Sequence, residues 1–364
     1  MIRSVRFVSV SLIRCKKSSL STSLVEEHDI SFSSFNNRLD AWVRAKDKQQ
    51  RSWMSPHTEK INVEYVGKIG PKETMKMTKG ISAPVDCAKH LSQLLVEQSA
   101  IALVNSEPWD MHRPLLSDCS VQFVHFKDAH NDPALANWAF WRSASFLLAA
   151  TLETAFHSEH KVRVLSIPPV RPESGGFVCD VCFRPSPTHT TSGSIQPWIP
   201  SQQELRALSA HGQRLAAGGL DFVPLDVQEH SEPFTECFRD EPYRRKQILA
   251  EFRQRIRSNG EETEDSNIRI TLYRLGGFVE ACAGGPLITS TRLIGRFAVT
   301  SFTPLGWLSN HKQESSEPLL VYRVQGLAIP TAFLTHFTTF DRLMQWSREP
   351  NTEVPARPDY LTPL

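Results

Sequence analysis

Hydrophobic residues in the segment 140–156 recur three and four positions apart, which is the spacing of one face of an α-helix. No glycine or proline interrupts residues 141–156, so the pattern predicts a continuous helix. Arg142 and Phe146 lie four positions apart, so their side chains should share a face and could converge on one ligand. The apolar stripe itself consists of Phe140, Ala144, Leu147, Leu148, Thr151, Ala155 and Phe156.

A group of shorter elements precedes this helix. Residues 61–66 predict a strand, residues 81–103 predict a turn followed by an amphipathic helix, and residues 121–126 predict a further strand. We therefore expect a compact α+β unit over residues 61–127. Upstream, Phe35, Leu39, Trp42 and Val43 have helical spacing, which predicts a helical extension within residues 28–60. This pattern leaves open whether the extension docks on a neighbouring molecule or on the body of the same chain.

Strands and helices also alternate after the long helix. Strands are predicted at residues 162–170, 175–183, 220–227, 296–302 and 319–330, and a helix begins at the Ser201 cap and ends at a glycine pair. Residues 232–257 are predicted to be helical on both sides of Pro242, and a last helix covers residues 331–347. We assign residues 128–345 to a second α+β domain and residues 346–364 to a Pro-rich C-terminal tail.

Two stretches carry a family resemblance. One is the long helix with Ser143 and the Leu147–Leu148 pair, and the other runs from residue 268 to residue 293. They resemble the editing domain of threonyl-tRNA synthetases, and residues 61–127 are similar to the TGS domain, a small β-grasp module that precedes editing in those enzymes. The second stretch matches the family at Tyr273, Gly276, Phe278, Cys282, Gly285, Pro286, Thr291 and Arg292.

The resemblance covers roughly residues 61–328 and implies a central helix packed against an antiparallel sheet. The pattern is also similar to a synthetase-derived family in the large subunit of the mitochondrial ribosome. We expect no aminoacylation domain.

The resemblance also locates the positions where the family carries reactive histidines. These are Arg142, Phe146 and Leu287, whereas Cys282 is retained. Arginine stays protonated, and phenylalanine and leucine have no donor or acceptor, so none can act as a base or metal ligand. We therefore predict that this chain is not an enzyme, with Phe146 and Leu287 filling one apolar space. A lone cysteine without an activating base is more often inert packing than a nucleophile. No cofactor and no small-molecule substrate is expected.

Cys179 and Cys182 form a CxxC pair, which could bind zinc, take part in redox chemistry or simply pack in the core. Paired thiolates at this spacing can bind zinc, but a structural zinc site requires two further ligands and the chain has no second CxxC. A redox CxxC normally opens a helix, whereas this pair lies in a strand-like pattern. We predict a packing role and no metal.

The charge balance does not by itself indicate a nucleic-acid-binding protein. The formal net charge is +2 over 364 residues, so a phosphate-binding surface would have to be local. One basic run is dense enough to be a candidate RNA-binding surface, although a solvated helix face explains it equally well. Its members are Arg244, Arg245, Lys246, Arg253, Arg255 and Arg257.

The first 27 residues have the composition of a mitochondrial transit peptide. They are rich in serine, contain five basic residues before the first acid at Glu26, and include an apolar element. The apolar residues are Val5, Phe7, Val8, Leu12 and Ile13. The alternative is a disordered basic terminus. No apolar run approaches the length needed to cross a bilayer, so membrane insertion is not expected.

These features together favour a structural component of the large subunit of the mitochondrial ribosome, in the matrix, with mitochondrial ribosomal RNA and neighbouring mitoribosomal proteins as partners. Two alternatives are an aminoacyl-tRNA editing hydrolase with a relocated centre and a free tRNA-binding factor.

Overall fold

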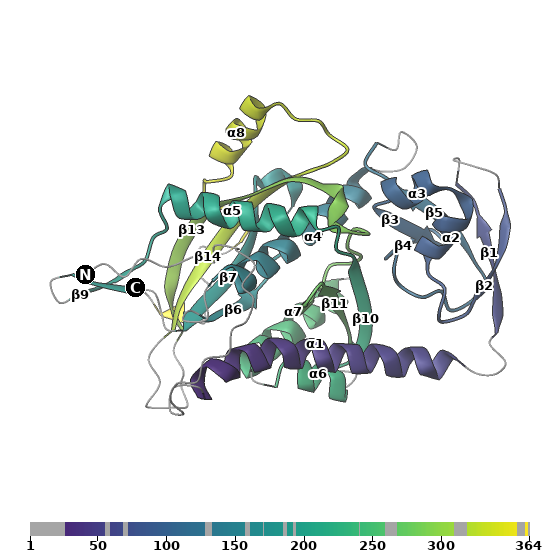
Figure 1. The fold of residues 1–364 in the computed structure, drawn as a ribbon, viewed down its shortest axis with the longest axis horizontal. Helices are drawn as coiled ribbons and strands as arrows, with labels where there is room; N and C mark the ends of the chain where they lie inside the picture. Colours follow the sequence, from purple (N-terminus) through teal and green to yellow (C-terminus); the bar gives the residue numbers. More distant parts are fainter. Residues whose placement is uncertain are drawn as a thin grey trace, which may run out of the picture.

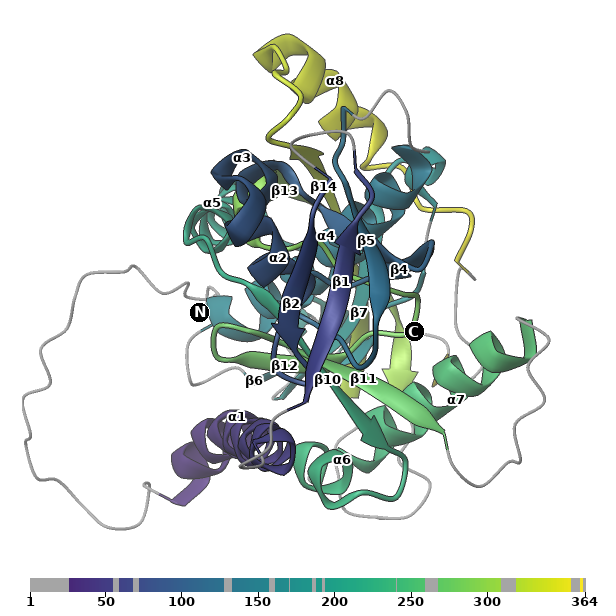
Figure 2. The same cartoon turned by 90° about the vertical axis from the view of Figure 1, so that its right-hand side faces the viewer.

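The computed structural model of the chain describes most of the sequence (Figures 1 and 2). The described residues are 26–54, 59–67, 72–127, 133–156, 161–169, 171–184, 188–191, 194–239, 241–258, 268–308, 319–354 and 361–362. Nearly all of the predicted transit segment 1–27 lies outside them, and helix α1 (Glu26–Trp53) begins at its last two residues.

The first unit is a five-stranded sheet covered by two short helices. Its strand order is β2-β1-β5-β3-β4, in which β1 and β5 are parallel and the other neighbours antiparallel. Alternate residues of β1 are buried, as expected for a strand with one face on a core. The elements are β1 (Lys60–Tyr65), β2 (Thr74–Thr78), α2 (Pro84–Leu91), α3 (Gln93–Gln98), β3 (Ile101–Val104), β4 (Glu107–Trp109) and β5 (Cys119–Val124).

The second unit is built on a larger antiparallel sheet with the order β15-β13-β14-β7-β6. Helices α4 (Pro133–Ala155) and α5 (Gln202–Ala217) pack on it, with α4 against β6, β7 and β14 and α5 against β13. Gly212 permits the close approach of α5, because a Cβ there would lie 2.3 Å from Phe297 Cε1. The strands are β6 (Lys161–Ser166), β7 (Phe177–Arg184), β13 (Ile294–Leu308), β14 (Leu319–Pro330) and β15 (Leu361–Thr362).

This arrangement confirms the predicted α+β fold with a central helix on an antiparallel sheet. Most of helix α4 is enclosed, because fourteen of its twenty-three residues are buried. A helix buried on nearly all sides needs apolar or small residues all round, which is what its sequence supplies. Five shorter elements accompany this unit: η1 (Pro172–Ser174), β8 (Thr188–Thr191), β9 (Ser194–Pro197), η2 (Thr291–Leu293) and α8 (Phe337–Trp346).

A third cluster of elements surrounds a small sheet with the order β10-β11-β12. Helix α6 ends before Pro242 and helix α7 begins at it, so the segment is helical on both sides of this proline, as predicted. Helix α1 runs along this cluster and contacts α6 and β12 (Figure 1), with Trp42 only 3% exposed. The extension therefore docks on the body of its own chain. The elements are β10 (Phe222–Gln228), α6 (Glu232–Cys237), α7 (Pro242–Ser258), β11 (Arg269–Leu275) and β12 (Phe278–Ala281).

No helix within the described part of the chain has the length and apolar character needed to cross a membrane.

Candidate functional site

The two apolar replacements predicted from the sequence lie in one buried cluster. Phe146 on α4 is fully buried, and its ring lies 5.1, 5.9 and 6.2 Å from the rings of Phe278, Phe222 and Tyr273. Leu287, in the segment after β12, is 1% exposed and belongs to the same core. Both side chains are thus buried in the same large core, and the expectation that they fill one common apolar space stays a prediction. Burying each contributes about 1.5–3 kcal/mol to the stability of the fold.

Arg142 is engaged with the backbone of the facing segment. Its Nε and Nη2 donate to the carbonyl oxygen of Pro286 at 3.2 and 2.8 Å. The aliphatic part of the side chain lies against Gly284, where a Cβ would come within 2.7 Å of Arg142 Cδ. Burial lowers the pKa of the guanidinium, but an arginine still remains protonated at any physiological pH. Arg142 therefore positions this segment and offers no base.

Ser143, the next residue on α4, holds the same segment. Its hydroxyl accepts the N–H of Ile288 at 2.8 Å and donates to the carbonyl of Ala139 at 2.7 Å. Two consecutive helix residues thus hold residues 286–288 through hydrogen bonds.

Cys282 is the potentially reactive residue that is retained at its family position, and its surroundings keep the thiol protonated. Burial raises the pKa of its thiol to about 11, although Arg142 and Arg255 act in the opposite direction. A cysteine nucleophile acts as the thiolate, so at neutral pH almost none of this residue would be in the reactive form. Arg142, Phe146 and Leu287 therefore offer no base, and Cys282 offers almost no thiolate at neutral pH.

A buried carboxylate that sequence reasoning missed lies beside this cluster. Asp110, which follows β4 in the first unit, is 2% exposed. It accepts the hydroxyl of Tyr273 at 2.9 Å, the N–H of Leu287 at 3.0 Å and Nε of Arg113 at 2.9 Å. Arg113 in turn pairs with Asp226 on β10. The only signal in the sequence was an acid and an arginine three positions apart, which is too common to single out.

The CxxC pair is divided between the two faces of the main sheet. Cys179 packs in the core beneath α4, whereas Cys182 belongs to a separate cluster with Leu165 and Leu305. Side chains three apart on a strand point to opposite faces, so the two sulfurs cannot share an ion. In the described ranges, no group of three or more His, Cys, Asp or Glu side chains is placed to hold a metal.

The structure removes Arg244 from the candidate RNA-binding residues. Its side chain is only 1% exposed, with Nε 3.2 Å from Glu280 Oε1 and Nη1 3.0 Å from Glu251 Oε1. The reason is the geometry of α7, whose inner face turns Arg244 toward β12. A guanidinium enclosed by two carboxylates is not available to a phosphate. Including Arg244 in a surface patch was wrong.

The other five basic residues of the run occupy the outer parts of α7. Lys246, Arg255 and Arg257 are exposed, whereas Arg245 and Arg253 are partly buried. Arg253 Nη2 lies 2.9 Å from Glu229 Oε1, which neutralises part of its charge. Lys246 and Arg257 lie near opposite ends of the helix and remain the strongest surface candidates.

Arg244 is part of a larger set of buried charges that links α1 to the body. Arg38 on α1 is 3% exposed, pairs with Glu241 and lies 3.5 Å from Glu153. Arg163 on β6 pairs with the same Glu241. Each carboxylate in this set thus faces at least one guanidinium, as buried ions require.

Comparison with known proteins places this geometry in context. Residues 67–125 match the TGS domain family. The chain is 35% identical over 301 residues to the large ribosomal subunit protein mL39 of Drosophila melanogaster, covering 82% of this chain and 79% of that protein.

Threonine–tRNA ligases are more distant relatives. A probable cytoplasmic ligase of Dictyostelium discoideum is 25% identical over 299 residues, and the human mitochondrial ligase is 26% identical over 253 residues. The matched regions span 34% and 29% of those two ligases. Because the identity to the Drosophila protein extends over about four-fifths of both chains, this protein belongs to the family of the large ribosomal subunit protein mL39.

Proposed function

We propose that the chain is a catalytically inactive structural component of the large subunit of the mitochondrial ribosome, derived from a tRNA synthetase and acting in the mitochondrial matrix. The observation that carries the proposal is the filled pocket: Phe146 and Leu287 are buried where the resembled family carries histidines. The mL39 relationship supplies the assembly in which such a scaffold would act.

Sedimentation tests this proposal. Tagged protein from a mitochondrial lysate should migrate with the large ribosomal subunit in a sucrose gradient, and should stay with it after subunit dissociation at low magnesium. Recovery only at the top of the gradient would contradict the proposal.

The runner-up function is hydrolytic editing of mischarged tRNA. Editing requires a water activated by a base or metal beside the ester bond. The described cluster offers Asp110 as its buried carboxylate, and that group is already occupied by Tyr273, Arg113 and the Leu287 amide. Incubation of the purified chain with mischarged threonine tRNA should therefore leave the ester intact. Deacylation above the rate of the uncatalysed reaction would favour the enzyme.

The retained scaffold serves, in this proposal, to bind ribosomal RNA and neighbouring proteins. The domains we propose are residues 1–27 as transit peptide, 28–60 as helical extension, 61–127 as TGS-like module, 128–345 as editing-like domain and 346–364 as tail. Phosphate contacts need local cations, and Lys246 and Arg257 are the exposed members of the α7 run best placed for them.

Charge reversal tests the α7 surface. Lys246→Glu with Arg257→Glu should release the protein from the large subunit at a lower salt concentration than wild type. Lys76→Glu, an exposed lysine on β2, is the matched control and should not change the salt at which release occurs. Equal release of all three proteins would place the anchoring contacts elsewhere.

A further inference from the structure

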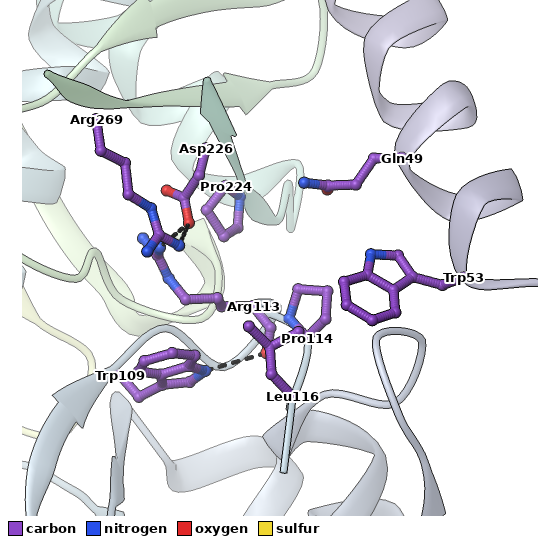
Figure 3. A pocket seen from close by; sticks show the side chains of 9 residues that line it. All are labelled: Gln49, Trp53, Trp109, Arg113, Pro114, Leu116, Pro224, Asp226 and Arg269. Atoms are coloured by element: carbon purple, nitrogen blue, oxygen red, sulfur yellow. Dashed lines mark hydrogen bonds and ion pairs between the residues drawn. The ribbon is translucent and has the colours of Figure 1, made fainter. Parts of the chain in front are cut away.

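A small pocket lies where three parts of the chain meet (Figure 3). We call it the junction pocket. Trp53 and Gln49 reach it from the end of α1, Trp109 and Leu116 from the TGS-like module, and Arg269 from β11. Its volume is about 220 Å³. An adjoining hollow of about 470 Å³ follows α1 and shares Gln49 and Arg269 with it.

The aromatic walls of the junction pocket are held in place. The indole Nε1 of Trp109 donates to the carbonyl of Arg113 at 3.2 Å, and the Arg113 guanidinium lies 5.4 Å from the Trp109 ring centroid. The ring of Trp53 packs on Gly80, where a Cβ would lie 2.3 Å from Trp53 Cδ2. Both rings are therefore oriented before any ligand arrives, which reduces the entropy cost of binding.

Polar groups and positive charge surround these rings. Asp226 is fixed by Arg113 and Arg269 and accepts the hydroxyl of Thr271 at 2.8 Å. The side chain of Arg269 is 60% exposed at the edge of the pocket. The adjacent stretch of α1, residues 44–53, contains four basic residues and one acid. Of these, Lys48 lines the adjoining hollow, whereas Arg44 is paired with Glu236 on α6.

We propose that the junction pocket receives one unstacked base of a single-stranded RNA segment. Single-stranded RNA is recognised by stacking bases on aromatic or guanidinium planes within a positively charged groove. Trp53, Trp109 and Arg113 provide such planes, and the Gln49 amide provides a donor and an acceptor for a base edge.

The cationic rim of α1 favours RNA over an apolar peptide side chain, which would gain nothing from it. That the RNA is ribosomal rests on the proposed function above.

Binding of a labelled oligonucleotide tests the pocket directly. The full chain is titrated into a fluorescein-labelled, 12-nucleotide single-stranded RNA of mixed sequence, and Kd is read from anisotropy. Trp53→Ala should weaken Kd by about 5- to 150-fold, the range found for loss of one base–aromatic stack. The control is Trp346→Ala, because Trp346 is 44% exposed and is the last residue of α8. Helix α8 lies at the top of Figure 1, whereas α1 runs along the bottom. This control should retain the wild-type Kd.

A second variant fills the pocket instead of truncating it. Leu116 lines the pocket and is 43% exposed, so Leu116→Trp should block entry without removing a core contact. Its thermal unfolding midpoint should match that of wild type while its Kd rises. Equal Kd for wild type, Trp53→Ala and Leu116→Trp, or no wild-type binding, would overturn the proposal.

Photo-crosslinking separates the two classes of occupant. A benzophenone amino acid at position 116 should crosslink to RNA in mitochondrial large subunits, whereas crosslinks to protein alone would assign the pocket to a peptide and overturn the proposal. If the protein co-sediments with large subunits but pocket variants bind the oligonucleotide normally, only this inference fails. If it does not co-sediment, the proposed function fails whatever the oligonucleotide shows.

Discussion

Arg244 places a full positive charge inside the protein, and that charge is accommodated by Glu280 and Glu251. Removing one partner of a buried ion pair is costly because it leaves the other charge without compensation. We predict that Arg244→Ala lowers the free energy of unfolding by about 3–5 kcal/mol. Arg257→Ala is the matched control on the same helix, and should cost less than about 1 kcal/mol. Urea denaturation of both variants measures the difference, and equal losses would show that Arg244 is not buried as described.

Glu280 makes stability depend on pH. Burial raises the pKa of its carboxyl from 4.5 to about 7, against the opposing effect of Arg244 and Arg38. Between these two values the folded state binds more protons than the unfolded chain, so this residue's contribution to stability falls as the pH rises.

The matched variant for this effect is Glu280→Gln, which stays neutral throughout. Relative to wild type, its free energy of unfolding should gain about 2–3 kcal/mol between pH 5 and pH 7.5. If the difference in free energy of unfolding between the two proteins stays constant with pH, the pKa of Glu280 is not raised by burial.

Individual residues differ in how far their roles could be predicted. Phe146 and Leu287 could be assigned to one cluster because motif spacing fixes their positions in the fold. The burial of Arg244 could not be predicted, because the sequence of a basic helix does not indicate which of its arginines faces inward. Its carboxylate partner Glu280 lies 36 positions away and becomes visible only when β12 is placed against α7. Asp110 was missed for the same reason, since its partner Tyr273 is 163 positions away.

At the scale of elements, helix α1 is attached to the body of the chain by packing contacts and by buried ion pairs. Trp42 is only 3% exposed. The Arg274 guanidinium carbon lies over the indole ring of Trp42, 5.0 Å from the ring centroid. Trp42→Ala should lower the free energy of unfolding by about 3–5 kcal/mol, because it opens a large cavity. Val43→Ala is the control, since Val43 is 37% exposed, and it should have little effect. Similar denaturation midpoints for the two variants would mean that α1 is not docked on the body.

The helical spacing of α1 was sufficient to predict the helix but not the surface that it covers. An amphipathic pattern shows that one face is buried and does not identify the partner. The partner of α1 is α6, about 200 positions later in the chain. The position of the long helix α4 was more predictable, because an apolar segment of that length is stable only when most of it is buried in a core.

At the scale of the whole molecule, the first unit is joined to the second through the buried cluster around Tyr273 and Leu287. Asp110 of the TGS-like module is bound to Tyr273 and to the Leu287 amide of the editing-like domain. Thr289 adds a second junction, with its N–H donating to the Ala100 carbonyl at 2.9 Å. The site that would need access to a substrate is thus part of a fixed interface between modules, which suits a scaffold.

The most direct measurement of the central claim is the rate of mitochondrial protein synthesis in cells whose only copy of this protein is Cys282→Ala. Cys282 is the one potentially reactive residue kept at its motif position, and its thiol has a pKa of about 11. If the protein acts only as a scaffold, incorporation of labelled amino acid should equal that of wild type, with the same amount of protein on the large subunit. A fall in synthesis while the variant remains bound to the ribosome would contradict the claim that its chemistry has been lost.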